Sequence, residues 1–85
     1  MPLYFFHIRN GMGFTPDDEG QELADVGAAR NVALRSARAL IAAEVAEGRI
    51  DLRGRIEVAD ADGAQVLVLP FAEAVELLTG DPPSD

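Results

Sequence analysis

The single histidine of the chain, His7, is the first side chain to consider for chemistry. Imidazole gains or loses a proton between about pH 5 and 8, so histidine is the most frequent general acid or base at neutral pH. No serine or threonine stands at a local spacing that would pair with His7 as a nucleophile. We therefore interpret His7 as a strand residue on a partly exposed or interface face, and an enzyme built on His7 is the third of three hypotheses.

An acidic segment, residues 17–25, is the second candidate. It contains five carboxylates: Asp17, Asp18, Glu19, Glu22 and Asp25. Carboxylate oxygens suit a hard cation, and Ca²⁺ takes about six to eight such ligands. The spacing matches no established ligand loop, which favours a solvated turn followed by a helix cap. A metal- or ligand-binding module that uses residues 17–25 remains the alternative hypothesis.

Several classes of chemistry are excluded by residues that the chain lacks. It has no cysteine, and therefore no disulfide, thiolate nucleophile or cysteine metal cluster. All seven basic residues are arginine, so no lysine can form a Schiff base. No glycine-rich phosphate loop, paired histidines or nucleophile elbow occurs. We expect no enzyme, no metal and no cofactor.

The charge of the chain makes polyanionic partners unfavourable. The formal net charge is −8 at pH 7, so a nucleic acid would be repelled by the protein's own field. Arg30, Arg35 and Arg38 are spread over a wide arc of a predicted helix, as on an ordinary solvated face. We expect no nucleic acid partner.

The sequence also lacks the signals of a membrane or secreted protein. No run approaches the roughly 20 apolar residues that a membrane-spanning helix needs. The first residues lack the pattern of a secretory signal peptide. We expect no membrane partner and a cytoplasmic location.

The elements that position these side chains follow from hydrophobic periodicity. Alternation predicts a first strand at residues 3–9, and Asn10-Gly11 predicts a tight turn into a short edge strand at 12–15. Strands at 55–60 and 65–69 flank Asp62-Gly63, the strongest hairpin signal in the chain. The sheet is therefore expected to contain three or four antiparallel strands.

Two helices complete the expected fold. Asp25 can cap a long helix over residues 26–47, and Gly48 can end it. Residues 71–78 have the spacing of a short C-terminal helix. The apolar stripe of the long helix consists of Val26, Ala29, Ala33, Leu34, Ala37, Leu40, Ile41 and Val45. We expect an α+β domain over residues 1–79, with the long helix on one face of the sheet, and a disordered tail at 80–85.

The second face of the expected sheet is the least ordinary feature. If the long helix covers Tyr4, Phe6 and Ile8, the opposite face is also partly apolar. Its residues in the first strand are Leu3, Phe5, His7 and Arg9. The short helix could cover this face within the monomer. Alternatively, a second copy of the chain could pack its own sheet face or sheet edge against it. The leading hypothesis is a non-enzymatic interaction or regulatory protein, a homodimer or the binder of another protein, with Arg55 and Glu57 at the rim of the contact.

Four segments together carry a family resemblance. They resemble a family of small uncharacterised bacterial proteins, a domain of unknown function, and they are the opening PLYFFHIRNG, the loop PDDEGQELAD, the alanine-rich helix that follows and the hairpin strand RIEVADADG. Its members read close to RYFFDIRDG and then D-x-E-G-x-E-L-x-D, and the likeness covers residues 2 to about 75. His7 and Asn10 stand where aspartate is common in that pattern. The resemblance supports the fold and implies no activity, cofactor or catalytic residue.

Overall fold

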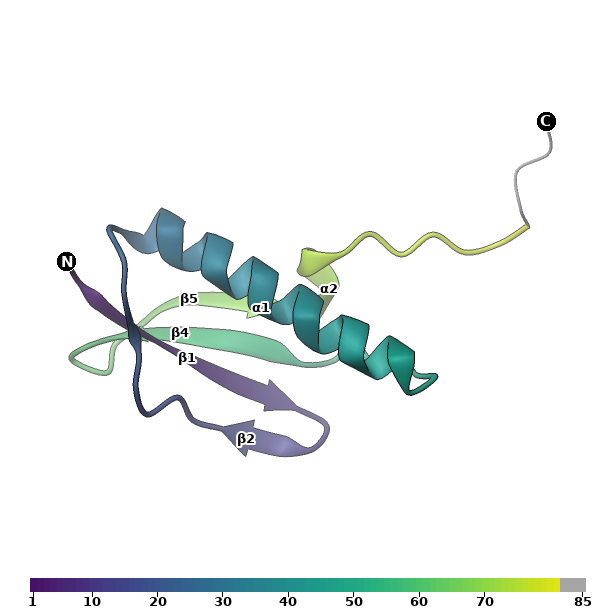
Figure 1. The fold of residues 1–85 in the computed structure, drawn as a ribbon, viewed down its shortest axis with the longest axis horizontal. Coiled ribbons are helices and arrows are strands. Elements are labelled where there is room, and N and C mark those ends of the chain that lie inside the picture. The colour runs from purple at the N-terminus through teal and green to yellow at the C-terminus, as the bar shows by residue number, and fades with distance from the viewer. Residues whose placement is uncertain (82–85) are drawn as a thin grey trace.

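Residues 1–81, the part of the chain that the computed structural model describes, fold into a five-stranded antiparallel sheet with one long helix on one face (Figure 1). The main strand order is β2-β1-β4-β5, and β3 also pairs with β1. The strands are β1 (Leu3–Asn10), β2 (Gly13–Thr15), β3 (Gln21–Glu22), β4 (Arg55–Asp60) and β5 (Gln65–Pro70). The helices are α1 (Val26–Ala46) and α2 (Phe71–Ala74).

Strand β1 is the centre of the fold. It pairs with β4 along one side, from Tyr4 opposite Asp60 to Arg9 opposite Arg55. Its other side is shared, because β2 pairs with its end and β3 with its beginning. The segment between β2 and β3 therefore crosses the middle of this side without being a strand.

Helix α1 lies on the sheet through its smallest residues. Ala29, Ala33 and Ala37, each four residues apart, are completely buried, and one helical face repeats at this spacing. Methyl side chains allow the helix backbone to approach the strands closely. The Asp25 side chain accepts a hydrogen bond from the Ala28 N–H at 2.8 Å and caps the helix start. Gly48, with φ 85°, ends the helix in the left-handed conformation that glycine adopts readily.

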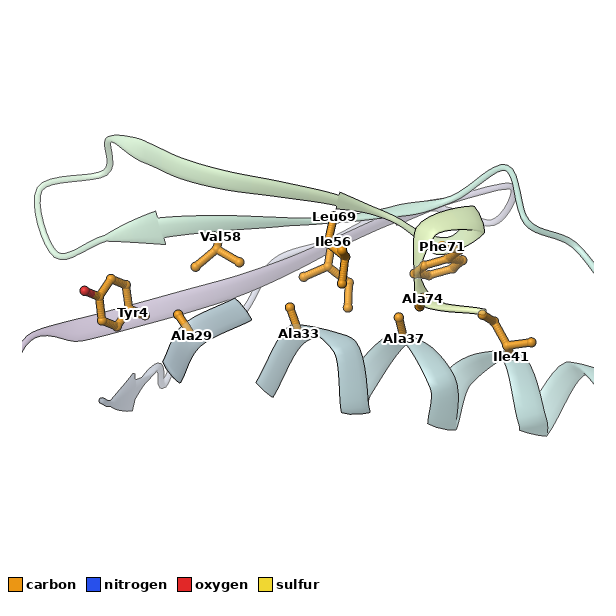
Figure 2. Close-up of a cluster of buried hydrophobic side chains, with 10 residues drawn as sticks. All are labelled: Tyr4, Ala29, Ala33, Ala37, Ile41, Ile56, Val58, Leu69, Phe71 and Ala74. Atoms are coloured by element: carbon orange, nitrogen blue, oxygen red, sulfur yellow. The ribbon is translucent and has the colours of Figure 1, made fainter. Parts of the chain in front are cut away.

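The core lies between α1 and the sheet, and α2 belongs to the same layer. Figure 2 shows the side chains of the strands pointing toward α1, with α2 beside the same helix. The buried cluster consists of Tyr4, Ala29, Ala33, Ala37, Ile41, Ile56, Val58, Leu69, Phe71 and Ala74. The Arg38 Nε also donates a hydrogen bond to the Ala74 carbonyl at 2.7 Å. The short helix therefore covers the face that α1 already covers.

The β4–β5 hairpin turns where the sequence predicts. The Asp60 carboxylate accepts hydrogen bonds from the N–H groups of Asp62 and Ala64, both at 2.9 Å, and Gly63 has φ 85°. Val58 pairs with Leu67 but Ala59 pairs with Gln65, so Val66 is an extra residue, a β-bulge. Asp60-Ala61-Asp62-Gly63 is therefore a hairpin turn.

The expected α+β fold is confirmed, with three differences in detail. The two-residue strand β3 adds a fifth strand, which is too short for a periodic signal. The helix expected at residues 71–78 ends at Ala74, because Val75 adopts extended dihedral angles. Val26 and Val45, expected on the buried stripe, are 41% and 50% exposed near the helix ends. Of the tail expected at 80–85, residues 82–85 lie outside the described part of the chain.

Candidate functional site

One face of the sheet is left without a helix. Within residues 1–81 both helices lie on the opposite side, as Figure 2 shows. We name the second side the uncovered face, and its residues include Leu3, Phe5, His7, Arg9, Phe14, Glu22, Arg55, Glu57, Ala59 and Val68. The structure thus places the four residues predicted from the first strand on one surface. Phe14 was not among the predicted residues, and the register of the Asn10-Gly11 turn is the signal that places it opposite Arg9.

The aromatic rings of this face form a connected row. The Phe5 and His7 rings are nearly parallel, 6° apart, with centroids separated by 6.4 Å. The His7 ring is also 5.7 Å from the ring of Phe14 on β2. The guanidinium carbon of Arg9 lies 4.5 Å from the Phe14 centroid, within the range of a cation–π contact. This part of the face is rich in aromatic side chains, as in the centres of many protein interfaces.

A cluster of three charges lies beside the aromatic row. Glu57 Oε2 accepts hydrogen bonds from the Nε atoms of Arg9 at 3.0 Å and Arg55 at 2.8 Å. The pKa of Glu57 is lowered, first by the Arg55 hydrogen bond; burial opposes this effect, but the hydrogen bonds and charges of Arg55 and Arg9 together outweigh it. Two arginines and one glutamate give this cluster one positive charge in excess, in a chain of net charge −8.

His7 is joined to the acidic segment. Its Nδ1 accepts a hydrogen bond from the Asp17 backbone N–H at 3.0 Å. The Asp17 carboxylate in turn accepts from the Phe6 N–H at 3.0 Å, and from the Glu19 and Gly20 N–H groups at 3.2 Å each. These bonds attach the segment to the middle of β1, in the gap between β2 and β3.

Asp17 is thereby a structural anchor. Burial raises the pKa of its carboxyl, but the hydrogen bonds from Phe6, Gly20 and Glu19 together lower the pKa below its ordinary value. Gly20 is required beside it, since its φ is 73° and a Cβ atom would lie 2.9 Å from Cε1 of Phe5. The anchor keeps the loop in contact with the first aromatic ring of the uncovered face.

The rest of the acidic segment is spread over the start of the fold. Asp25 caps α1, and Glu22 lies in β3 opposite Leu3. In residues 1–81, no three histidine, aspartate or glutamate side chains gather in a way that could hold a metal ion. The geometry therefore gives the cation hypothesis no support.

A separate cavity of about 270 Å³ lies at the C-terminal end of α1. Leu40, Ile41 and Phe71 are among its lining residues, and none of the uncovered face contributes to it. Two ion pairs stand at it, Arg49 with Glu44 at 2.8 Å and Arg53 with Asp51 at 3.0 Å. The Arg53 hydrogen bond lowers the pKa of Asp51 to about 2. The charges of both pairs are therefore already neutralised within the cavity.

Comparison with known proteins identifies a family and no activity. A family model described as a domain of unknown function, DUF6894, matches residues 3–72, which include every strand and α1. No curated protein and no solved structure matched the chain. The expected resemblance to a family of unknown function is confirmed, while its bacterial distribution remains a prediction. No helix in residues 1–81 is long and apolar enough to cross a membrane.

Proposed function

The chain belongs to DUF6894, a domain of unknown function, and we propose that it is a non-enzymatic interaction protein that pairs with a second copy of itself. The contact surface is the uncovered face. The observation that carries this proposal is the row of Phe5, His7 and Phe14, which neither helix covers within residues 1–81. In the proposal the protein acts in the cytoplasm as a regulatory or adaptor subunit.

The position of α2 supports this assignment. Only two occupants for the second sheet face follow from the sequence, the short helix or a partner. Phe71 and Ala74 of α2 are buried in the core beside α1, which removes the short helix as a cover. Phe14 remains 46% exposed and Phe5 and His7 half-buried, and grouped apolar surface of this kind is characteristic of contact sites.

The sheet edges are less suited to pairing than the face. At β5 the bulge at Val66 interrupts the regular spacing of the outer backbone groups. Pro70 has no N–H to donate, and both devices are common protections of edge strands. At the other edge the strands are very short, since β2 has three residues and β3 has two. Each edge therefore offers too few aligned donors and acceptors for a stable strand–strand contact.

The size of the face sets the strength of the contact. Four strands spaced about 4.8 Å apart, rising about 3.3 Å per residue, present roughly 400–500 Å². Two such faces would bury about 800–1,000 Å² in total, below the standard interface of about 1,600 Å². We therefore expect a dimer that dissociates on dilution. Arg9, Arg55 and Glu57 would provide polar specificity at its rim.

The test is the molar mass in solution over a concentration series, measured by light scattering for the wild type and Phe5→Asp. We expect a concentration-dependent wild-type dimer and a monomeric variant, because the new carboxylate would be desolvated in the contact. Ala39→Asp, on an exposed position of α1, is the matched control and should stay dimeric. Circular dichroism checks that the variants fold.

Two results would contradict the proposal. A wild-type protein that stays monomeric at hundreds of micromolar excludes the homodimer. A folded Phe5→Asp variant that dimerises as well as the wild type moves the contact away from the uncovered face.

A further inference from the structure

We propose that His7 makes the pairing of the uncovered faces sensitive to pH. The inference rests on the proposed function and adds regulation to the same surface. The basis of the inference is that the His7 imidazole makes two sets of contacts at the same time. It lies in the aromatic row between Phe5 and Phe14, and it holds the Asp17 loop against β1.

The hydrogen bond from Asp17 defines the protonation state of the ring. The Asp17 N–H donates to Nδ1 at 3.0 Å, so Nδ1 carries a lone pair and the ring proton is on Nε2. A second proton would convert Nδ1 into a donor that faces another donor. Protonation of His7 therefore breaks the Asp17 N–H contact, and either the ring or the loop must move.

The charged groups around His7 come from three elements. Arg9 follows on β1, Glu57 of β4 stands directly opposite His7 in the ladder, and Asp17 lies in the loop. Phe14 of β2 adds no charge. Both carboxylates are already hydrogen-bonded, and both keep their negative charge. Asp17 accepts three backbone N–H groups, and Glu57 accepts two arginine Nε atoms.

A protonated His7 adds a positive charge to the uncovered face, beside Arg9 and opposite Glu57. In a symmetric dimer each copy brings this charge to the same contact, where it is desolvated and close to its counterpart. Acidification from about pH 8 to about pH 5, the range in which histidine takes up a proton, should therefore weaken the dimer. The loop beside Phe5 changes its contacts in the same transition.

The experiment compares the wild type with His7→Asn at about pH 8 and about pH 5. The asparagine side-chain oxygen stands where Nδ1 stood, so it can accept the Asp17 N–H but does not titrate in this range. We expect the dimer dissociation constant of the wild type to rise at least about tenfold on acidification, and that of His7→Asn to change less than about twofold. All carboxylates are shared by the two proteins, so their titration cancels in the comparison. Equal pH dependence in the two proteins would overturn the inference.

A second readout separates this inference from the proposed function. The backbone amide signal of Asp17, followed by nuclear magnetic resonance, should shift between about pH 8 and about pH 5 in the wild type and stay in place in His7→Asn. If the wild type is monomeric at both pH values, the pairing fails, and a shifting Asp17 signal still supports the link between His7 and the loop. A wild-type Asp17 signal that does not move overturns that link as well.

Discussion

The two faces of the sheet are made by alternate residues of the same strands, yet their side chains differ in burial and in the interactions they make. On the covered face, Ile56 and Val58 are completely buried beneath alanines of α1. On the uncovered face, Glu57 accepts hydrogen bonds from both Arg55 and Arg9. One face gains stability from close packing beneath a helix, and the other presents aromatic, apolar and charged groups that no helix covers within residues 1–81.

The difference shows what a second layer requires. A helix can lie close to a sheet only where its contacting residues are small, and Ala29, Ala33 and Ala37 meet this condition. No such element meets Phe5, His7 and Phe14 within residues 1–81. Substitutions on the covered face should therefore change the free energy of unfolding, and those on the uncovered face should mainly change association.

The largest difference is expected when the same substitution, valine to alanine, is made once on each face. Val58→Ala on the covered face should lower the free energy of unfolding by about 2–3 kcal/mol, because it removes buried methyl groups and leaves a cavity. Val68→Ala on the uncovered face should cost less than about 1 kcal/mol in the monomer. Urea denaturation at low protein concentration measures both. Equal losses would mean that the second face is covered after all.

A smaller effect is expected at Asp17, which connects the loop to the sheet. Asp17→Asn should cost about 1–2 kcal/mol at neutral pH, since a neutral amide oxygen replaces a carboxylate that accepts three N–H groups. The pKa of Asp17 is lowered in the folded state, so its stabilisation is complete above its ordinary value of 3.8 and is lost as the pH falls below it. Urea denaturation of both proteins at neutral pH and at about pH 3 should show the difference shrinking in acid. A difference that persists in acid would mean that the carboxylate charge is not what holds the loop.

The smallest effect is expected at the charge cluster of the uncovered face. Glu57→Gln should lower the free energy of unfolding by less than about 1 kcal/mol, because its arginine partners are 46% and 45% exposed in their side chains. The pKa of Glu57 is also lowered by folding, so this contribution again disappears as the pH falls below its ordinary value of 4.5. Thermal unfolding in low and high salt should show a smaller difference in high salt. A salt-independent loss of several kcal/mol would place Glu57 in the stabilising core.

Local signals in the sequence were sufficient for most of the secondary structure. Alternation over β1 and β4, the Asp25 cap, Gly48 and the Asp62-Gly63 turn all depend on residues that are close in the chain, and each acts where it was expected. In the acidic segment the Asp25 cap was correctly predicted, but the expected solvated turn was wrong at Asp17, which is bonded to β1, and at Glu22, which lies in β3. The short length of α2 was missed, because the extended conformation of Val75 has no local signal.

By itself, the sequence determined an α+β fold with a long helix on one sheet face, because side-chain periodicity fixes which residues share a face. It also placed Leu3, Phe5, His7 and Arg9 together. Only the tertiary structure decided that α2 packs beside α1 and that the Asp17 N–H meets His7 Nδ1. Both contacts join segments whose proximity depends on how the whole chain folds, and no periodicity within either segment encodes the other's position.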